Sequence, residues 1–293
     1  MSVKNPIIAI TGSSGSGSHR VGTVFSHIAW RQKIKPLIFN GSAFHSYERD
    51  AMQQAVKDAV AKGRHLSHFS PDGNRLDLLA SFLSEYAETG KGRYRDYLHT
   101  ESEVREAGGK LGGFTDWKQI PGDTDLLVYQ GLHGAYRDDD VDISQLADFT
   151  IGVAPIVNLE WIQKIHNDTL NRGYSLEEVK SVINNRLIDY VRYITPQFTN
   201  TDVNFQRVPL VDTSNPFVAR DVPSCDESVV ILHFRHPETQ DFSYLMKMIQ
   251  GSFMSRRNTV VVPGGKMEYA MELVLSPVVK TMMEKRRQLL ETG

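Results

Sequence analysis

Residues 6–20 read Pro-Ile-Ile-Ala-Ile-Thr-Gly-Ser-Ser-Gly-Ser-Gly-Ser-His-Arg, and this stretch decides the fold class. The apolar run at 6–11 is typical of a buried strand, and residues 12–18 form a Gly/Ser turn. An apolar stripe with helical spacing follows, made of Val21, Val24, Phe25, Ile28 and Ala29. A strand, a glycine-rich turn and a helix in this order favour a loop that holds phosphate with backbone N–H groups. By spacing alone, a plain tight turn is an equal alternative.

Outward from this stretch, strand-like and helix-like segments alternate. Further strands are expected at 36–40, 125–129, 149–154, 203–211, 228–235 and 258–262. Helices are expected from the turn to about 33 and at 49–62, 74–88, 158–171, 175–193 and 266–289. Such alternation predicts an α/β fold with a mixed, mostly parallel sheet and helices on both faces. No repeat or linker interrupts the pattern, so we expect one domain over 1–293.

The composition excludes some classes of binding partner. Net charge is −2, so there is no bulk electrostatic attraction to nucleic acid or to a membrane surface. Hydrophobic residues make up 40%, which is ample for a sizeable core. No apolar run approaches the roughly 20 residues of a membrane span. Cys225 is the single cysteine and cannot form an internal disulfide, so we expect a reduced, cytoplasmic protein.

Longer segments carry a family resemblance. They are Tyr129-Gln-Gly-Leu-His-Gly-Ala135, Val157-Asn-Leu-Glu-Trp-Ile-Gln-Lys-Ile-His166, the stretch 194–217 and Ala43-Phe44-His45. Over essentially its whole length the chain resembles the bacterial class of phosphoribulokinase. The resemblance implies a P-loop kinase-like core and the transfer of the γ-phosphate of Mg-ATP to the 1-hydroxyl of ribulose 5-phosphate. It also implies a homo-oligomer that responds to effectors such as NADH and AMP.

The resemblance assigns roles residue by residue. It implies a nucleotide-binding loop that comprises Gly12, Gly15, Gly17, Ser18, His19 and Arg20. It places His45, Arg49 and Arg172 on the sugar phosphate, and Lys164 and Asp168 among the catalytic groups. Arg31 and Arg256 match arginines that the family uses for effector nucleotides near subunit contacts.

Four positions depart from the family's pattern. Ser42 stands where the family has its catalytic aspartate, and a serine hydroxyl is far too weak a base to replace it. Gln130 replaces a glutamate at a strand end, and Asn167 replaces an arginine. His19 removes a hard oxygen ligand. We therefore expect poor binding of Mg²⁺, assign no metal ligands, and expect turnover far below that of the family.

Three functions stay open. The first is a catalytically impaired family member that binds a sugar phosphate or a nucleotide as a sensor or regulatory protein. The second is an active sugar-phosphate kinase in which Asp168 or a neighbouring carboxylate is the base and Arg20 supplies the loop cation. The third is a structural subunit that assembles with an intact paralogue. Without the resemblance, each lone arginine, histidine or lysine would be an ordinary surface or loop residue.

Overall fold

The computed structural model describes residues 4–13, 19–219 and 221–291, with the backbone alone for residues 19, 171 and 172. A sheet of eight strands forms its centre, in the order β2-β5-β1-β6-β7-β8-β10-β9. The strands are β1 (Ile7–Thr11), β2 (Pro36–Asn40), β5 (Leu126–Gly131), β6 (Phe149–Val153), β7 (Val203–Pro209), β8 (Ser228–Phe234), β9 (Phe253–Arg256) and β10 (Thr259–Pro263). A small second sheet pairs β3 (Arg93–Tyr94) with β4 (Lys118–Gln119).

The direction of the strands changes across the sheet. The five strands from β2 to β7 run parallel, as the right-handed connections through helices require. From β7 onward the neighbours β8, β10 and β9 pair antiparallel. The predicted α/β fold with a mixed, mostly parallel sheet is thus confirmed.

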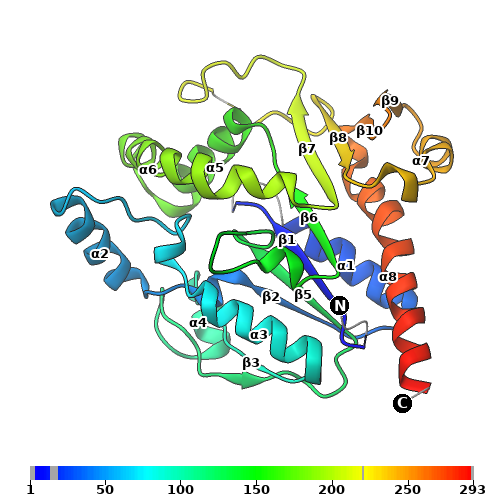
Figure 1. Ribbon diagram of the computed structural model, residues 1–293. Coiled ribbons are helices and arrows are strands. Elements are labelled where there is room, and N and C mark those ends of the chain that lie inside the picture. The colour runs from blue at the N-terminus through cyan, green and yellow to red at the C-terminus, as the bar shows by residue number, and fades with distance from the viewer. Residues whose placement is uncertain (1–3, 14–18, 220, 292–293) are drawn as a thin grey trace.

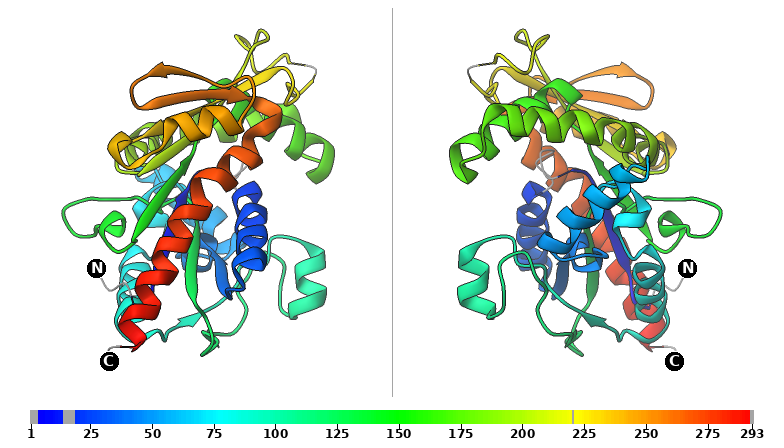
Figure 2. Two further views of the ribbon diagram at one scale, coloured as in Figure 1. Left: turned by 90° about the vertical axis from the view of Figure 1, so that its right-hand side faces the viewer. Right: turned by 90° about the vertical axis from the view of Figure 1, so that its left-hand side faces the viewer.

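Helices cover both faces of this sheet. The α-helices of the described residues are α1 (His19–Gln32), α2 (Arg49–Ala61), α3 (Leu76–Thr89), α4 (Glu101–Ala107), α5 (Val157–Arg172), α6 (Leu176–Asp189), α7 (Phe242–Met248) and α8 (Met267–Glu291). Of these, α1, α7 and α8 pack into the core on one face and α3 into the core on the other. Figure 1 shows the sheet between α3 on one side and α8 on the other. In Figure 2, β9 and β10 lie at one end of the molecule, and α8 runs from there along the sheet.

Two hydrophobic cores explain why β1 is apolar from Ile7 to Ile10. Successive side chains of a strand point to opposite faces. Ile8 and Ile10 pack into one core with α1, α7 and α8, whereas Ile7 and Ala9 pack into the other with α3. The run 7–11 is completely buried because both faces are covered. No helix among the described residues is both long enough and apolar enough to cross a bilayer.

Candidate active site at the carboxyl edge of the sheet

Parallel strands end at the same edge of a sheet, and ligands of open α/β sheets bind outside that edge. Here β1 ends at Thr11, β2 at Asn40 and β5 at Gly131. Gln130 lies between the two neighbouring strands, in register with Ile10 of β1 and Asn40 of β2. The sequence-predicted Gly12, Ser42 and Gln130 therefore meet at one edge, although they are far apart in the chain.

The described start of the glycine-rich loop is anchored to β5. The backbone N–H of Gly12 donates to the carbonyl of Gly131 at 3.0 Å. Position 131 has no room for a larger residue, because a Cβ there would lie 2.4 Å from the hydroxyl of Tyr129. Gly15, Gly17 and Ser18 lie outside the described residues, as does the side chain of His19.

Arg20 lies in the first turn of α1 and is directed toward α8. Its Nη1 lies 3.3 Å from Oε1 of Glu268 and 4.0 Å from Sγ of Cys225. Its charge is therefore shared with a carboxylate of another helix. This arrangement does not favour the alternative in which Arg20 supplies the missing cation of the loop.

A buried carboxyl group lies beneath the loop. Glu160 of α5 accepts hydrogen bonds from the hydroxyl of Ser13 and, at 3.1 Å, from the hydroxyl of Tyr190. Burial raises the pKa of Glu160, and the two hydroxyl groups and Lys164 only partly counter this effect. The sequence offered no signal for Glu160, since a glutamate in the first turn of a helix is ordinary.

One face of α5 carries three of the charged groups. Glu160, Lys164 and Asp168 follow one another at intervals of four residues, which places them on the same side of a helix. Lys164 Nζ lies 2.5 Å from Asp168 Oδ2, and both side chains are largely buried. The amide of Asn167 donates to the other oxygen of Asp168 at 3.4 Å. Arg172 is the last residue of α5.

A second group of side chains follows β2. The chain turns through Gly41–Phe44, and the side chain of Asn40 accepts from the N–H of Ser42 at 3.0 Å. The hydroxyl of the buried Ser42 lies 3.1 Å from Nε2 of His99. Arg49 begins α2 and donates from Nη2 to the carbonyl of His99 at 3.2 Å. The segment around His99 thus lies against both Ser42 and Arg49.

His45 is a neutral donor rather than a cation. It is 8% exposed, and its Nδ1 donates to Oδ1 of Asn74 at 2.8 Å. Burial lowers the pKa of His45 to about 4, so the side chain is uncharged at physiological pH. His68 stacks on it with ring centroids 4.2 Å apart, and burial lowers the pKa of His68 to about 2.

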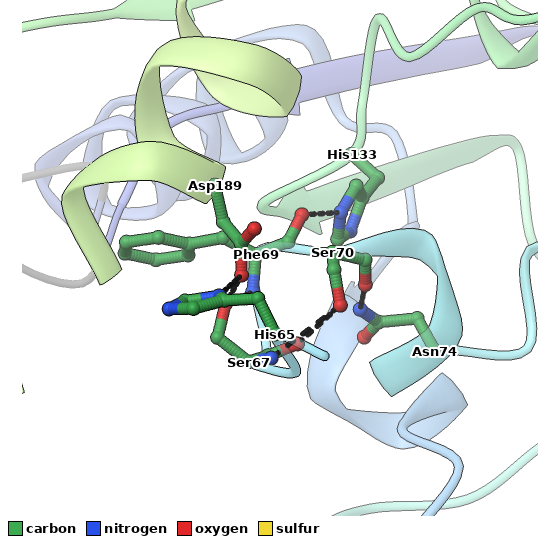
Figure 3. Close-up of polar contacts among 7 residues, drawn as sticks. All are labelled: His65, Ser67, Phe69, Ser70, Asn74, His133 and Asp189. Atoms are coloured by element: carbon green, nitrogen blue, oxygen red, sulfur yellow. Dashed lines mark hydrogen bonds and ion pairs between the residues drawn. The ribbon is translucent and has the colours of Figure 1, made fainter. Parts of the chain in front are cut away.

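Residues 65–74 form a loop that is hydrogen-bonded to α6 and to the segment after β5 (Figure 3). Asp189, at the end of α6, accepts from Nδ1 of His65 at 2.9 Å and from the hydroxyl of Ser67 at 2.6 Å. His133 donates from Nε2 to the carbonyl of Phe69 at 3.0 Å, and burial lowers the pKa of His133 to about 4. The same loop holds Asn74, whose amide donates to the carbonyl of Ser70 at 2.8 Å.

Arg186 of α6 connects the two groups of side chains electrostatically. Its positive charge contributes to the lowered pKa of both His45 and His68. Burial lowers the pKa of Arg186, and the negative charges of Asp168 and Asp189 oppose that effect. Sequence reasoning missed Arg186 and His99, because a lone arginine on a polar helix and a lone loop histidine carry no motif.

The two arginines expected for effectors lie away from this group. Arg31 belongs to the last turn of α1, and its guanidinium lies 2.5 Å from Glu272 of α8. Arg256 is the last residue of β9, the edge strand, and is exposed. Neither forms part of the carboxyl-edge site.

The two carboxylates of α5 are not placed as magnesium ligands. Mg²⁺ prefers hard, anionic oxygen ligands. Both oxygens of Glu160 and both of Asp168 are engaged by protein donors, and Gln130 offers only a neutral amide oxygen. Within 4–13, 19–219 and 221–291, no three His, Cys, Asp or Glu side chains are placed to hold a metal ion. These residues alone do not fit the ion.

Comparisons with known proteins agree on one family. Residues 7–214 match the model of the Phosphoribulokinase / Uridine kinase family. The chain is 49% identical over 289 residues to the chromosomal phosphoribulokinase of Cupriavidus necator, covering 98% of this chain and 99% of the relative. It is 50% identical to the phosphoribulokinase of Xanthobacter flavus, with the same coverage. The solved phosphoribulokinase from Rhodobacter spheroides superposes with a TM-score of 0.89 at 47% identity, covering 98% of this chain and 100% of that one.

Proposed function

The chain belongs to the Phosphoribulokinase / Uridine kinase family, and we propose that it binds a sugar phosphate and a nucleotide in the family's active site but transfers phosphate slowly. The observation that carries the proposal is Ser42. It stands at the end of β2, where the family resemblance expects an aspartate, and its hydroxyl is bonded to an imidazole. The loss of a general base lowers a rate by about 10²–10⁴.

The sugar-phosphate half of the site supports the binding part of the proposal. Arg49 is held at the start of α2, Lys164 lies on α5, and His45 offers a neutral imidazole beside the charge of Arg186. A guanidinium and an ammonium group suit a phosphate dianion, because both donate charge-assisted hydrogen bonds. Arg172, at the end of α5, is assigned to the same role by the resemblance alone.

The nucleotide half supports slow transfer. Family membership suggests the use of ATP and Mg²⁺, but Gln130 carries no charge at the position where the family resemblance expects a glutamate. We propose that ATP binds through backbone donors at the start of α1 and that bound ATP depends little on Mg²⁺.

The experiment is a coupled assay of nucleoside diphosphate release from ATP and ribulose 5-phosphate. We expect turnover at least about 10³-fold below that of an active relative, because base and metal ligands are both replaced. A restored variant combines Ser42→Asp, Gln130→Glu, His19→Ser and Asn167→Arg, since single reversions in a coupled site recover little. Turnover of the native chain at the level of an active relative would refute the proposal.

We further propose a homo-oligomer in the cytoplasm, in line with the family resemblance and the single cysteine. Arg31 and Arg256 are exposed in one chain and would bind effector nucleotides near subunit contacts. Assembly with an intact paralogue is the alternative. Light scattering of the purified chain separates the two, because a protein that stays monomeric alone would require a partner.

A further inference from the structure

We propose that His99 is the general base of the slow transfer and takes the substrate's proton through the hydroxyl of Ser42. This inference rests on the proposed function and deepens it. In the neutral imidazole with its proton on Nδ1, Nε2 accepts a hydrogen bond. In this tautomer, the 3.1 Å contact makes the hydroxyl of Ser42 a donor to Nε2 of His99. A serine that is too weak a base alone becomes a proton relay when a base lies behind it.

The position of the pair matches this role. Ser42 is 7% exposed and fixed by the turn at the carboxyl end of β2, the edge at which substrates of this fold class bind. The backbone of His99 is fixed twice: its carbonyl accepts from Arg49 at 3.2 Å, and its N–H donates to Oε2 of Glu103 at 2.6 Å. The ring also lies beside that of Tyr97, with centroids 4.8 Å apart.

His99 differs from the other histidines at this end of the sheet. His45, His68 and His133 have pKa values lowered to about 4, about 2 and about 4 by burial, so they are very weak bases. His99 is exposed and can exchange its proton with water. The carboxylate of Asp168, an alternative base, is already paired with Lys164 at 2.5 Å.

Ser42 and Tyr97 lie against the ring of His99, whereas Arg49 of α2 and Glu103 of α4 bond to its backbone. A positive charge on His99 lowers the pKa of the buried His45 and His68.

The transfer moves one phosphoryl group and one proton. The hydroxyl oxygen of the sugar phosphate forms a bond to the γ-phosphorus of a nucleoside triphosphate. The bond from that phosphorus to the β–γ bridging oxygen breaks, and the nucleoside diphosphate leaves with the electron pair. The hydroxyl proton passes to Oγ of Ser42 as the proton of Ser42 passes to Nε2 of His99. The imidazolium then loses its proton to water.

The test measures single-turnover formation of ADP from ATP and ribulose 5-phosphate between pH 5.5 and 8.5. We expect the native rate to rise with pH through one ionisation, that of the imidazole. His99→Gln and Ser42→Ala should each lower the rate about 10²-fold and remove this ionisation. The control is His236→Gln, a change at an exposed histidine bonded to Glu238 between β8 and α7, which should leave rate and profile unchanged.

A second set of measurements separates an effect on catalysis from effects on folding and on binding. Calorimetry should show sugar phosphate bound equally well by the native chain and by His99→Gln. In the variant that combines the four reversions the rate should rise, and adding His99→Gln should then lower it only a few-fold, because the carboxylate introduced at position 42 accepts the proton directly. An unchanged rate and profile in His99→Gln, or no transfer by the native chain, overturns the role of His99. A failure to bind sugar phosphate, or turnover at the level of an active relative, overturns the proposed function itself.

Discussion

Acidification is expected to destabilise the protein through its buried histidines. His45, His68 and His133 are neutral in the folded chain because burial lowers their pKa from 6.5 to about 4, about 2 and about 4. In the unfolded chain each imidazole is solvated and titrates near 6.5. Below that pH the unfolded state binds more protons than the folded state, so the free energy of unfolding falls as the pH falls.

The magnitude follows from these values. At pH 5 each imidazole is protonated in the unfolded chain and neutral in the folded one. The free energy of unfolding falls by about 1.4 kcal/mol for each pH unit below 6.5, and pH 5 lies 1.5 units below that value. Each histidine thus contributes a loss of about 2 kcal/mol between pH 8 and pH 5, and the three together about 4–6 kcal/mol. This loss is a large fraction of the 5–15 kcal/mol that is typical of domains. Glu160 acts in the opposite sense, because its raised pKa favours the folded state on protonation.

Urea unfolding followed by circular dichroism at pH 8, 7, 6 and 5 measures the effect. In His133→Gln, which keeps a donor for the carbonyl of Phe69, the difference between pH 8 and pH 5 should shrink by about 2 kcal/mol. The comparison is between pH values within one variant, so a general loss of stability does not obscure it. His236→Gln, at an exposed site, should leave the difference unchanged. A native free energy of unfolding that is flat between pH 8 and pH 5 would refute the reasoning.

Three further outcomes are expected. Ribulose 5-phosphate should raise the thermal midpoint of unfolding by mass action, and Arg49→Ala should abolish that shift. ATP should give the same small shift with magnesium or with EDTA. An ATP shift that requires magnesium would contradict the weak metal site. Arg256→Ala should weaken AMP and NADH binding in calorimetry, and unchanged affinities would remove this arginine from the effector site. Gly112→Ala should lower the free energy of unfolding by about 1–3 kcal/mol in urea titrations. The reason is that φ at Gly112 is +75° and that a Cβ there would lie 2.5 Å from the Cβ of Arg49. A change below about 0.5 kcal/mol would contradict this view of the turn.

The sequence predicted the long elements well. Apolar runs located the five parallel strands of the central sheet, of which 7–11 is buried on both faces. It missed the short elements α4, α7 and β9, which have too few residues to show a period. A signal for α4 was nevertheless present, because Thr100 and Glu103 form a capping box at its start. The expected helix at 175–193 ends as an α-helix at Asp189 and continues as a π-helical turn.

The candidate site was less predictable than the fold. The resemblance placed Ser42, His45 and Arg49, but the contact between Ser42 and His99 joins residues 57 positions apart and follows no local pattern. The neutral state of His45 depends on burial beneath the loop 65–74, which sequence periodicity does not report. The charge of Arg186 interacts with Asp168 and Asp189, which belong to two different helices. Long-range contacts, rather than residue types, decide the chemistry here.

The three-residue stripe on α5 has a mechanical consequence. Glu160 accepts from Ser13 at the start of the glycine-rich loop, and Lys164 and Asp168 lie one and two turns further along the same helix. A helix of 16 residues behaves as a stiff element, so its residues move together. A displacement of Ser13 must therefore either break its bond to Glu160 or carry the lysine and the aspartate with it.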